Sequence, residues 1–188
     1  MKLEHADMLA RDVADKLRPY CDRIEIASSV RRRKPEVGDI EIVCIPRMIT
    51  RDDVLPILHT DGGRLINHEM MRDPLWAKIV RSLGDVIKGD PASGKYVQVE
   101  LQDEQHGGIA VDIFTAHKRN WGLIYAIRTG SATYSHKVLA CGWVANGYHS
   151  VAGMLMRDGV EVPTFEEDDV FALAGVPWCE PQLREVCL

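Results

Sequence analysis

The stretch Ser28-Ser29-Val30-Arg31-Arg32-Arg33-Lys34-Pro35-Glu36-Val37-Gly38-Asp39-Ile40-Glu41 decides how the fold is interpreted, because it leads into the apolar run 42–45. Residues 39–45 are predicted to form a β-strand. Side chains alternate along a strand, so Asp39 and Glu41 should share one face while Ile40 points into a core. Two carboxylates on one face can bind a hard divalent cation, since Mg²⁺ prefers oxygen ligands. The alternative is an edge strand with a solvated polar face.

A third carboxylate lies in the middle of a second apolar strand, predicted over residues 108–114. Val111 and Ile113 should share one face of that strand, with Asp112 on the other. An unpaired carboxylate is costly to bury, so Asp112 needs a cation or faces water. Asp112 is therefore the candidate third ligand for a metal held by Asp39 and Glu41.

The densest positive charge in the chain lies just before the first two carboxylates, at residues 31–34. A cationic loop beside a metal site suits a polyphosphate ligand. The alternative is a charged, solvated turn. Ser28 and Ser29 would meet an anion if a short helix begins there, or would simply cap a turn.

The remaining pattern predicts an α+β fold. Helical periodicity predicts helices over 4–18, 52–58, 74–83, 121–128 and 131–144, and alternation predicts strands around 24–26, 86–88 and 96–101. A hairpin is expected at 154–162, around Asp158-Gly159. Thr164 and Glu167 have the spacing of a capping box for a last helix that ends at Gly175. The character changes near residues 115–120, from mixed α and β to mainly helical.

Composition narrows the function classes. The 188 residues carry a net charge of −5, which argues against tight non-specific nucleic-acid binding. No apolar run of 18 residues exists and the N-terminus lacks a signal peptide, so a cytoplasmic, non-membrane protein is expected. The five cysteines are scattered and are interpreted as reduced, mostly buried thiols. The seven histidines show no spacing typical of metal ligands.

Four stretches resemble family X DNA polymerases, the polymerase beta group, in that family's order and spacing. Ser29-Val30-Arg31-Arg32 leading to Gly38-Asp39-Ile40-Glu41 resembles the family's G-S-x-R-R … G-D-x-D signature. Val111-Asp112-Ile113 resembles the strand of its third carboxylate. Trp121-Gly122 with Thr129-Gly130-Ser131 is similar to the start of the thumb, and residues 166–185 to its closing segment.

The resemblance implies two domains and a set of site residues. Residues 1–117 would form a nucleotidyltransferase palm, a mixed β-sheet with flanking helices, and residues 118–188 a small, mainly helical thumb with a β-hairpin. The implied ligands of Mg²⁺, for which Mn²⁺ can substitute, are Asp39, Glu41 and Asp112. The implied nucleotide-binding residues are Ser29, Arg32, Gly38, Gly130 and Ser131. Weaker implied DNA contacts are Arg31, Arg33, Lys34, His136 and Lys137.

The chain departs from the family pattern at several positions. Ser28 replaces the first glycine, Glu41 replaces the second aspartate, and Ala110 replaces an arginine. Ile127-Arg128 replaces an aromatic pair, and Ser135 stands where the family often has asparagine. The metal and phosphate residues therefore match the family better than the sugar and base residues do.

The resemblance implies a monomeric, DNA-directed nucleotidyltransferase that adds dNMP from a dNTP to a DNA 3′-hydroxyl by two-metal-ion phosphoryl transfer, as in repair-type gap filling. One alternative is the same chemistry on a non-DNA acceptor. The other is a non-catalytic module that binds nucleotides or DNA ends.

Overall fold

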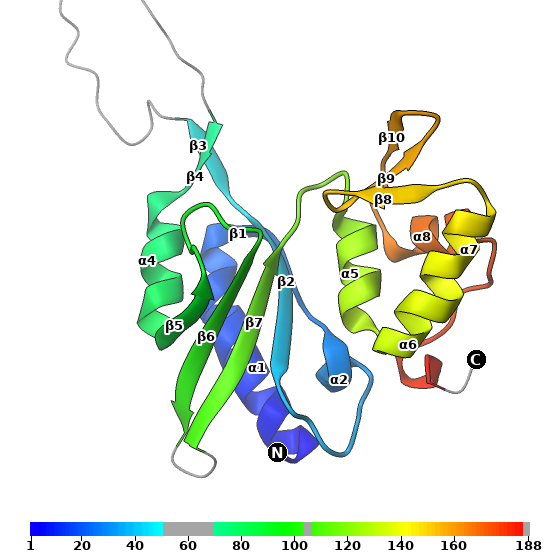
Figure 1. Cartoon of the computed structure of the whole chain (residues 1–188). Helices are drawn as coiled ribbons and strands as arrows, with labels where there is room; N and C mark the ends of the chain where they lie inside the picture. The colour runs from blue at the N-terminus through cyan, green and yellow to red at the C-terminus, as the bar shows by residue number, and fades with distance from the viewer. Residues whose placement is uncertain (51–69, 104–106, 186–188) are drawn as a thin grey trace, which may run out of the picture.

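A five-stranded mixed sheet forms the centre of the N-terminal half (Figure 1). The computed structural model describes residues 1–50, 70–103 and 107–185. Together with flanking helices and a mainly helical C-terminal half, the sheet confirms the α+β fold class. The helix expected over 52–58 lies outside the described residues, as does Cys187. No helix of the described ranges is long and apolar enough to span a bilayer.

The sheet has the strand order β1-β2-β7-β6-β5. Its strands are β1 (Cys21–Ile26), β2 (Ile40–Pro46), β5 (Asp85–Gly89), β6 (Tyr96–Asp103) and β7 (Gly107–Thr115). β2 and β7 are parallel, whereas the other neighbouring strands are antiparallel. A small separate sheet consists of the antiparallel pair β3 (Met48–Thr50) and β4 (Met70–Arg72). The two strands predicted to carry the carboxylates are therefore direct neighbours.

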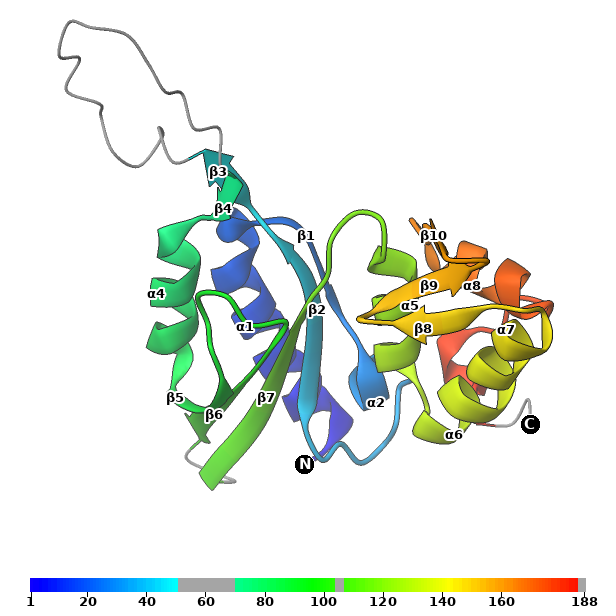
Figure 2. The same ribbon diagram turned by 45° about the horizontal axis from the view of Figure 1, so that its top comes forward.

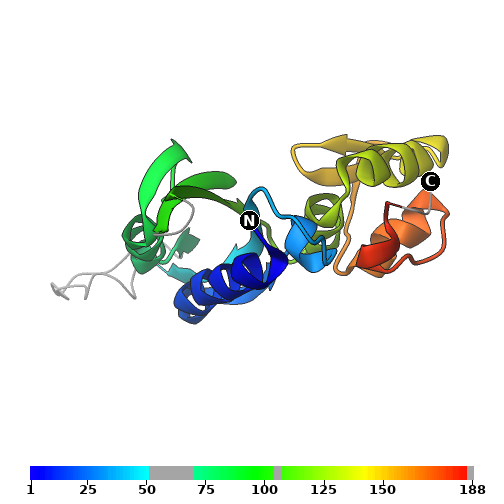
Figure 3. The ribbon, with the colours of Figure 1, turned by 90° about the horizontal axis from the view of Figure 1, so that it is seen from below.

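Two helices cover one face of this sheet, α1 (Leu3–Leu17) and α4 (Pro74–Leu83). A short 3₁₀ turn, η1 (Arg18–Tyr20), connects α1 to β1. In Figure 3, α1 lies on the opposite side of the sheet from β8 and β9. The core between helices and sheet takes alternate residues of the strands, including Ile40, Ile42, Val111 and Ile113, all at most 1% exposed. The other face of β2 and β7 is consequently the one that carries Glu41 and Asp112.

A smaller core forms on that second face. Trp121, at the start of α5 (Trp121–Thr129), packs there with Ala27, Val43 and Phe114. The short helix α2 (Ser28–Arg31) lies beside α5, between the sheet and the C-terminal helices (Figure 2). The C-terminal half is thus anchored to one part of the face by a buried tryptophan.

The C-terminal half has its own core, built around Tyr134, Leu139, Leu155 and Phe171. Its helical run consists of α6 (Ala132–Tyr134), a π-helical turn η2 (Ser135–Ala140) and α7 (Cys141–Ala145), where the sequence predicts one helix. The predicted hairpin is β9 (Met154–Arg157) with β10 (Val160–Val162). An unpredicted third strand, β8 (His149–Val151), pairs with β9. The chain closes with α8 (Glu167–Ala174) and η3 (Pro181–Leu183).

The predicted capping box of the last helix is wrong by two residues. Glu166 is the N-cap, and its backbone N–H donates to Asp169 Oδ2 at 2.9 Å. Thr164 is buried instead, and its Oγ1 accepts the backbone N–H of Leu123 at 3.3 Å. A tertiary hydrogen bond to α5 therefore takes the hydroxyl that the local pattern assigns to α8.

Candidate active site

Glu41 and Asp112 lie side by side on neighbouring strands. They are direct partners in the parallel ladder between β2 and β7, and neighbouring strands are about 4.8 Å apart. Asp39 immediately precedes β2, which begins at Ile40, so it is not part of the strand as predicted. Burial, and then the charge of Asp112, raise the pKa of Asp39. All three predicted carboxylates thus belong to one region of the sheet's second face.

Asp112 is held in place from the next strand. The hydroxyl of Tyr96 donates to Asp112 Oδ1 at 2.9 Å, and Nε2 of Gln98 donates to the same oxygen at 2.8 Å. Gln98 is the direct ladder partner of Asp112 in the β6–β7 pair. Within the described residues no hydrogen bond reaches Oδ2. Hydrogen bonds to Oδ1 therefore orient the carboxylate and leave Oδ2 available to a ligand.

Glu41 carries an unsatisfied buried oxygen. Its Oε2 is buried and has no hydrogen-bond partner among the described residues. Burial, followed by the charges of Asp39 and Asp112, raises the pKa of Glu41 to about 7, against the opposing effects of Arg128 and the Ser28 hydroxyl. A buried polar atom without a partner is costly and calls for a specific explanation. A bound cation would supply the missing partner.

The donor set fits a hard divalent cation in its chemistry. All three groups are carboxylates, and Mg²⁺ takes oxygen ligands from one or two carboxylates, water and substrate phosphates. In the described ranges, however, no three or more His, Cys, Asp or Glu side chains are arranged as a complete metal-binding group. The fit therefore depends on small side-chain rotations and on oxygens that a substrate would bring.

The predicted phosphate loop has an unusual backbone. Ser28 has φ +54°, in the left-handed region that favours glycine. Its hydroxyl lies close enough to Glu41 to oppose the upward shift in the pKa of that carboxyl. The hydroxyl oxygen of Ser29 is buried without a hydrogen-bond partner in the parts of the chain described. The hydroxyl oxygen of Ser29 is thus a second buried oxygen without a partner within the described ranges, in addition to Oε2 of Glu41.

The basic run is engaged with the C-terminal half. Arg31 donates to Thr129 Oγ1 and to Glu167. Arg32 donates to the carbonyl of Thr129 and, at 3.3 Å, to Glu185. Glu185 also accepts a hydrogen bond from Lys34. The sequence suggests that this run either binds a polyphosphate or forms a solvated turn. The contacts add a third role, because three cations of the run connect the segment around α2 to α5, α8 and the C-terminal segment.

Sequence reasoning missed the buried centre of this network. Arg184 is 0% exposed, and it donates at 3.0 Å both to Glu167 Oε1 and to the carbonyl of Cys179. Its guanidinium lies about 5 Å from the ring centroids of Phe171 and Trp178. Glu167 is therefore shared by two arginines, one from each half of the chain. The one signal in the sequence that could have indicated these ion pairs was the opposite charge of the acidic C-terminal segment and the basic run.

Two pockets open beside the carboxylates. The first, of about 530 Å³, is called the Glu41 pocket, and its lining includes Ser28, Arg32, Glu41, Gly130, His136 and Trp143. The second, of about 600 Å³, is called the Asp112 pocket, and its lining includes Lys95, Tyr96, Asp112, Phe114, Asn120 and Gly153. Both volumes lie in the usual range for small-ligand sites. Arg128 lines both pockets.

The remaining predicted site residues differ in how closely the structure brings them to the two pockets. Gly130 has φ +70°, and a Cβ there would lie 2.9 Å from Nη1 of Arg32, so the glycine permits close approach. Gly38 shows no such constraint, since a Cβ there would meet no atom within 4 Å. Ser131 caps α6 by accepting the N–H of Tyr134 at 3.3 Å. Lys137 and Arg33 are exposed and line neither pocket.

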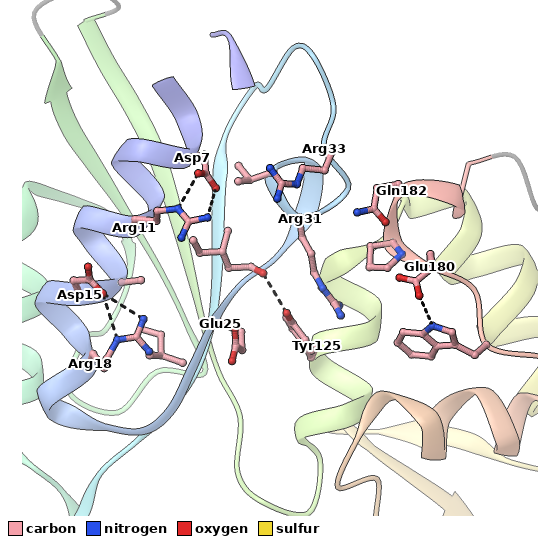
Figure 4. A pocket seen from close by; sticks show the side chains of 16 residues that line it. Asp7, Arg11, Asp15, Arg18, Glu25, Arg31, Arg33, Tyr125, Glu180 and Gln182 are labelled. Atoms are coloured by element: carbon pink, nitrogen blue, oxygen red, sulfur yellow. Dashed lines mark hydrogen bonds and ion pairs between the residues drawn. The ribbon is translucent and has the colours of Figure 1, made fainter. Parts of the chain in front are cut away.

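A further cleft, of about 470 Å³, lies along the free edge of β1 between α1 and the C-terminal segment (Figure 4). Two of its cations are balanced by acids: Arg11 donates to Asp7 at 2.8 Å, and Arg18 donates to Asp15 at 3.3 Å. Arg33, which projects into it in Figure 4, makes no ion pair with any described residue. None of the three candidate carboxylates lines this cleft, so it is not the candidate active site.

A scan against protein-family models gives no match to the chain, and a search of curated proteins gives none either. The candidate site is therefore defined by its own residues.

Proposed function

We propose that the protein is a nucleotidyltransferase that adds a deoxynucleotide to the 3′-hydroxyl of DNA. One observation carries the proposal: the buried, unpartnered Oε2 of Glu41 lies on the strand beside Asp112, next to a pocket that contains Arg32. A metal ion would satisfy the carboxylates, and a triphosphate would satisfy the arginine. Both ligands are required by this one chemistry.

Asp39, Glu41 and Asp112 would hold Mg²⁺, with Mn²⁺ as a substitute. Bound metal ions would supply activation of the attacking hydroxyl and neutralisation of the negative charge on the leaving group. Tyr96 and Gln98 fix Asp112 through its Oδ1, so its other oxygen keeps one direction. Such outer-shell hydrogen bonds set the orientation of metal-binding side chains.

In the reaction, the acceptor oxygen forms a bond to the α-phosphorus and loses its proton to a site carboxylate or water. The bond from that phosphorus to the pyrophosphate oxygen breaks, and its electron pair leaves with pyrophosphate. The protein contributes position and charge rather than a nucleophile. The Glu41 pocket suits the nucleotide, because its lining combines the polar side chains of Arg32 and Ser28 with the apolar side chains of Ile127 and Trp143.

DNA would be the acceptor in repair-type gap filling, by a monomer acting in the cytoplasm. Arg33, His136 and Lys137 are exposed and available to phosphates, whereas Arg31 and Lys34 are already paired. With a net charge of −5, affinity for DNA is expected to be modest and to fall steeply with salt.

A specific observation also favours a smaller acceptor. The Asp112 pocket is bounded by the turn between β8 and β9, at Ala152 and Gly153. This turn is fixed to the rest of the protein, since Lys95 donates to the carbonyl of Ala152 at 3.0 Å and Asn120 to that of Gly153 at 2.9 Å. A fixed wall on one side of the pocket suits a nucleoside or another small hydroxyl compound.

Primer-extension assays on gapped, recessed and single-stranded DNA, with dNTP and NTP pools and with Mg²⁺ or Mn²⁺, test the proposal. Extension is expected, with its loss in Asp39→Ala and in Asp112→Asn. Asp22→Asn, which changes an exposed carboxylate on β1, is the matched control.

Transfer to a labelled small hydroxyl acceptor, without extension of DNA, would favour the second candidate. Metal-dependent triphosphate binding without turnover on any acceptor would indicate a binding module. Absence of both binding and transfer would refute the nucleotidyltransferase proposal.

A further inference from the structure

Arg128 stands on the border between the two pockets. It lies in the last turn of α5 and lines the Glu41 pocket on one side and the Asp112 pocket on the other. The two carboxylates are ladder partners on adjacent strands, so the border between the pockets lies close to both. A ligand that extends from one pocket into the other would have to pass this side chain.

The guanidinium of Arg128 is unpaired. Arg128 is exposed, and it makes no hydrogen bond or ion pair with the described parts of the chain. Most of the arginines that join the two halves behave differently: Arg23 pairs with Glu166, Arg31 with Glu167, and Arg184 with the same Glu167. Arg128 thus keeps all five N–H donors available to a ligand.

Its orientation is nevertheless defined. The guanidinium carbon lies 3.8 Å from the ring centroid of Phe114, which is itself stacked on Tyr96 with centroids 5.0 Å apart. A guanidinium that lies flat on an aromatic ring directs its N–H groups outward along its edges. The stack Tyr96–Phe114–Arg128 therefore starts at the residue that orients Asp112 and ends in a free hydrogen-bond donor.

Arg128 is the residue that the two pockets share. Besides Arg128, the Glu41 pocket contains Arg32 and the Asp112 pocket contains Lys95. An anion that extends from one pocket into the other would therefore meet a positively charged side chain in each pocket and at their border.

We propose that Arg128 binds the α-phosphate of the nucleotide at the border of the two pockets. This inference rests on the proposed nucleotidyl transfer and adds to it a residue that the sequence pattern does not supply. The planar fork of the guanidinium matches two oxygens of one phosphate group. A hydroxyl in the Asp112 pocket would then face the phosphorus that Arg128 holds from the Glu41 pocket.

Binding measurements test this without turnover. The probes are an α,β-methylene deoxynucleoside triphosphate, whose α-phosphate cannot be transferred, and inorganic pyrophosphate, both with Mg²⁺ and titrated by calorimetry. Arg128→Gln removes the charge and the guanidinium that stacks on Phe114 but keeps a polar, unbranched side chain. Affinity for the analogue is expected to fall about ten- to a hundredfold in Arg128→Gln, with pyrophosphate binding within about twofold of wild type. Arg128→Lys should lie between the two.

Arg157→Ala is the matched control, because this arginine stacks on Tyr148 and bonds its hydroxyl at 3.1 Å, away from both pockets. Thermal unfolding of each variant separates a folding defect from a binding defect. Equal affinity of wild type and Arg128→Gln for the analogue would overturn the inference and leave the proposed function standing. A wild-type protein that binds neither probe would overturn both.

Discussion

The hydroxyl of Tyr96 donates a 2.9 Å hydrogen bond to Oδ1 of Asp112. Burial and this bond raise the pKa of Tyr96 to about 12, so the phenol stays protonated and remains a donor across the physiological range. Gln98 donates to the same oxygen. Asp112 is thus one of the most firmly oriented carboxylates of the candidate site, although it lies on an open face of the sheet.

Replacing Tyr96 with Phe removes one of these two donors and keeps the stacking on Phe114. The metal affinity or transfer rate that depends on Asp112 should fall about tenfold, and the free energy of unfolding should fall by about 1 kcal/mol. Titration with Mn²⁺ and denaturant unfolding measure the two effects. Tyr148→Phe, which removes the hydroxyl partner of Arg157, is the control. An unchanged metal affinity in Tyr96→Phe would show that Gln98 alone orients the carboxylate.

Glu41 predicts a characteristic pH dependence of stability in metal-free protein. Its pKa is raised from 4.5 to about 7 on folding, so between these values the native state binds more protons than the unfolded state. Stability attributable to this group therefore falls as the pH rises from about 4.5 to about 7. Glu41→Gln removes the buried charge and should stabilise the protein by about 2 kcal/mol near pH 8, with a much smaller effect near pH 5.

Urea unfolding with a chelator at the two pH values gives this comparison. Glu4→Gln, a change at an exposed glutamate of α1, should leave the pH dependence as in wild type. Parallel stability curves for Glu41→Gln and wild type would mean that Glu41 titrates as a solvated group. Saturating Mg²⁺ should reverse the sign of the effect, because the wild-type carboxylate would then bind the ion.

We predict that the contact between the two halves is especially sensitive to substitution of Glu167. It bonds Arg184, which is 0% exposed, and Arg31, whose side chain is 19% exposed. Glu167→Gln leaves a buried guanidinium without its counter-charge, which should destabilise the protein by about 3 kcal/mol. Asp168→Asn, an exposed neighbour in the same helical turn, should have an effect of about 0.5 kcal/mol or less. Chemical unfolding measures the free energy of unfolding of both variants. Equal values for Glu167→Gln and Asp168→Asn would contradict the prediction.

The strands that carry the carboxylates were predictable because the signal is local. The β2 and β7 segments alternate strongly between buried apolar residues and the second face, and that period places Glu41 and Asp112. Their direct pairing was not predictable, since it depends on a parallel register between segments some 70 residues apart in the sequence. Asp39 shows the same limit at smaller scale, because the strand begins one residue later than its pattern indicates.

The misses have definite physical causes. β8 consists of three exposed residues and pairs along only one edge, so it leaves little periodicity to read. Thr164 has the right spacing for a cap, but a buried bond to Leu123 takes its hydroxyl and the overlapping pair Glu166 and Asp169 caps instead. The partners of the basic run are acids more than 130 residues away, and a single sequence contains no signal for which acid meets which base.

Glu185 gives the basic loop a resident competitor. Its carboxylate is shared by Arg32 and Lys34, and it is attached to the same chain, so its local concentration near these cations does not change on dilution. Any soluble anion that binds Arg32 must displace the Glu185 carboxylate. Its observed binding free energy is therefore the difference between the free energy of its own interaction with Arg32 and that of the interaction with Glu185. Glu185→Gln would therefore tighten the binding of anions by the loop, although Glu185 does not line the Glu41 pocket.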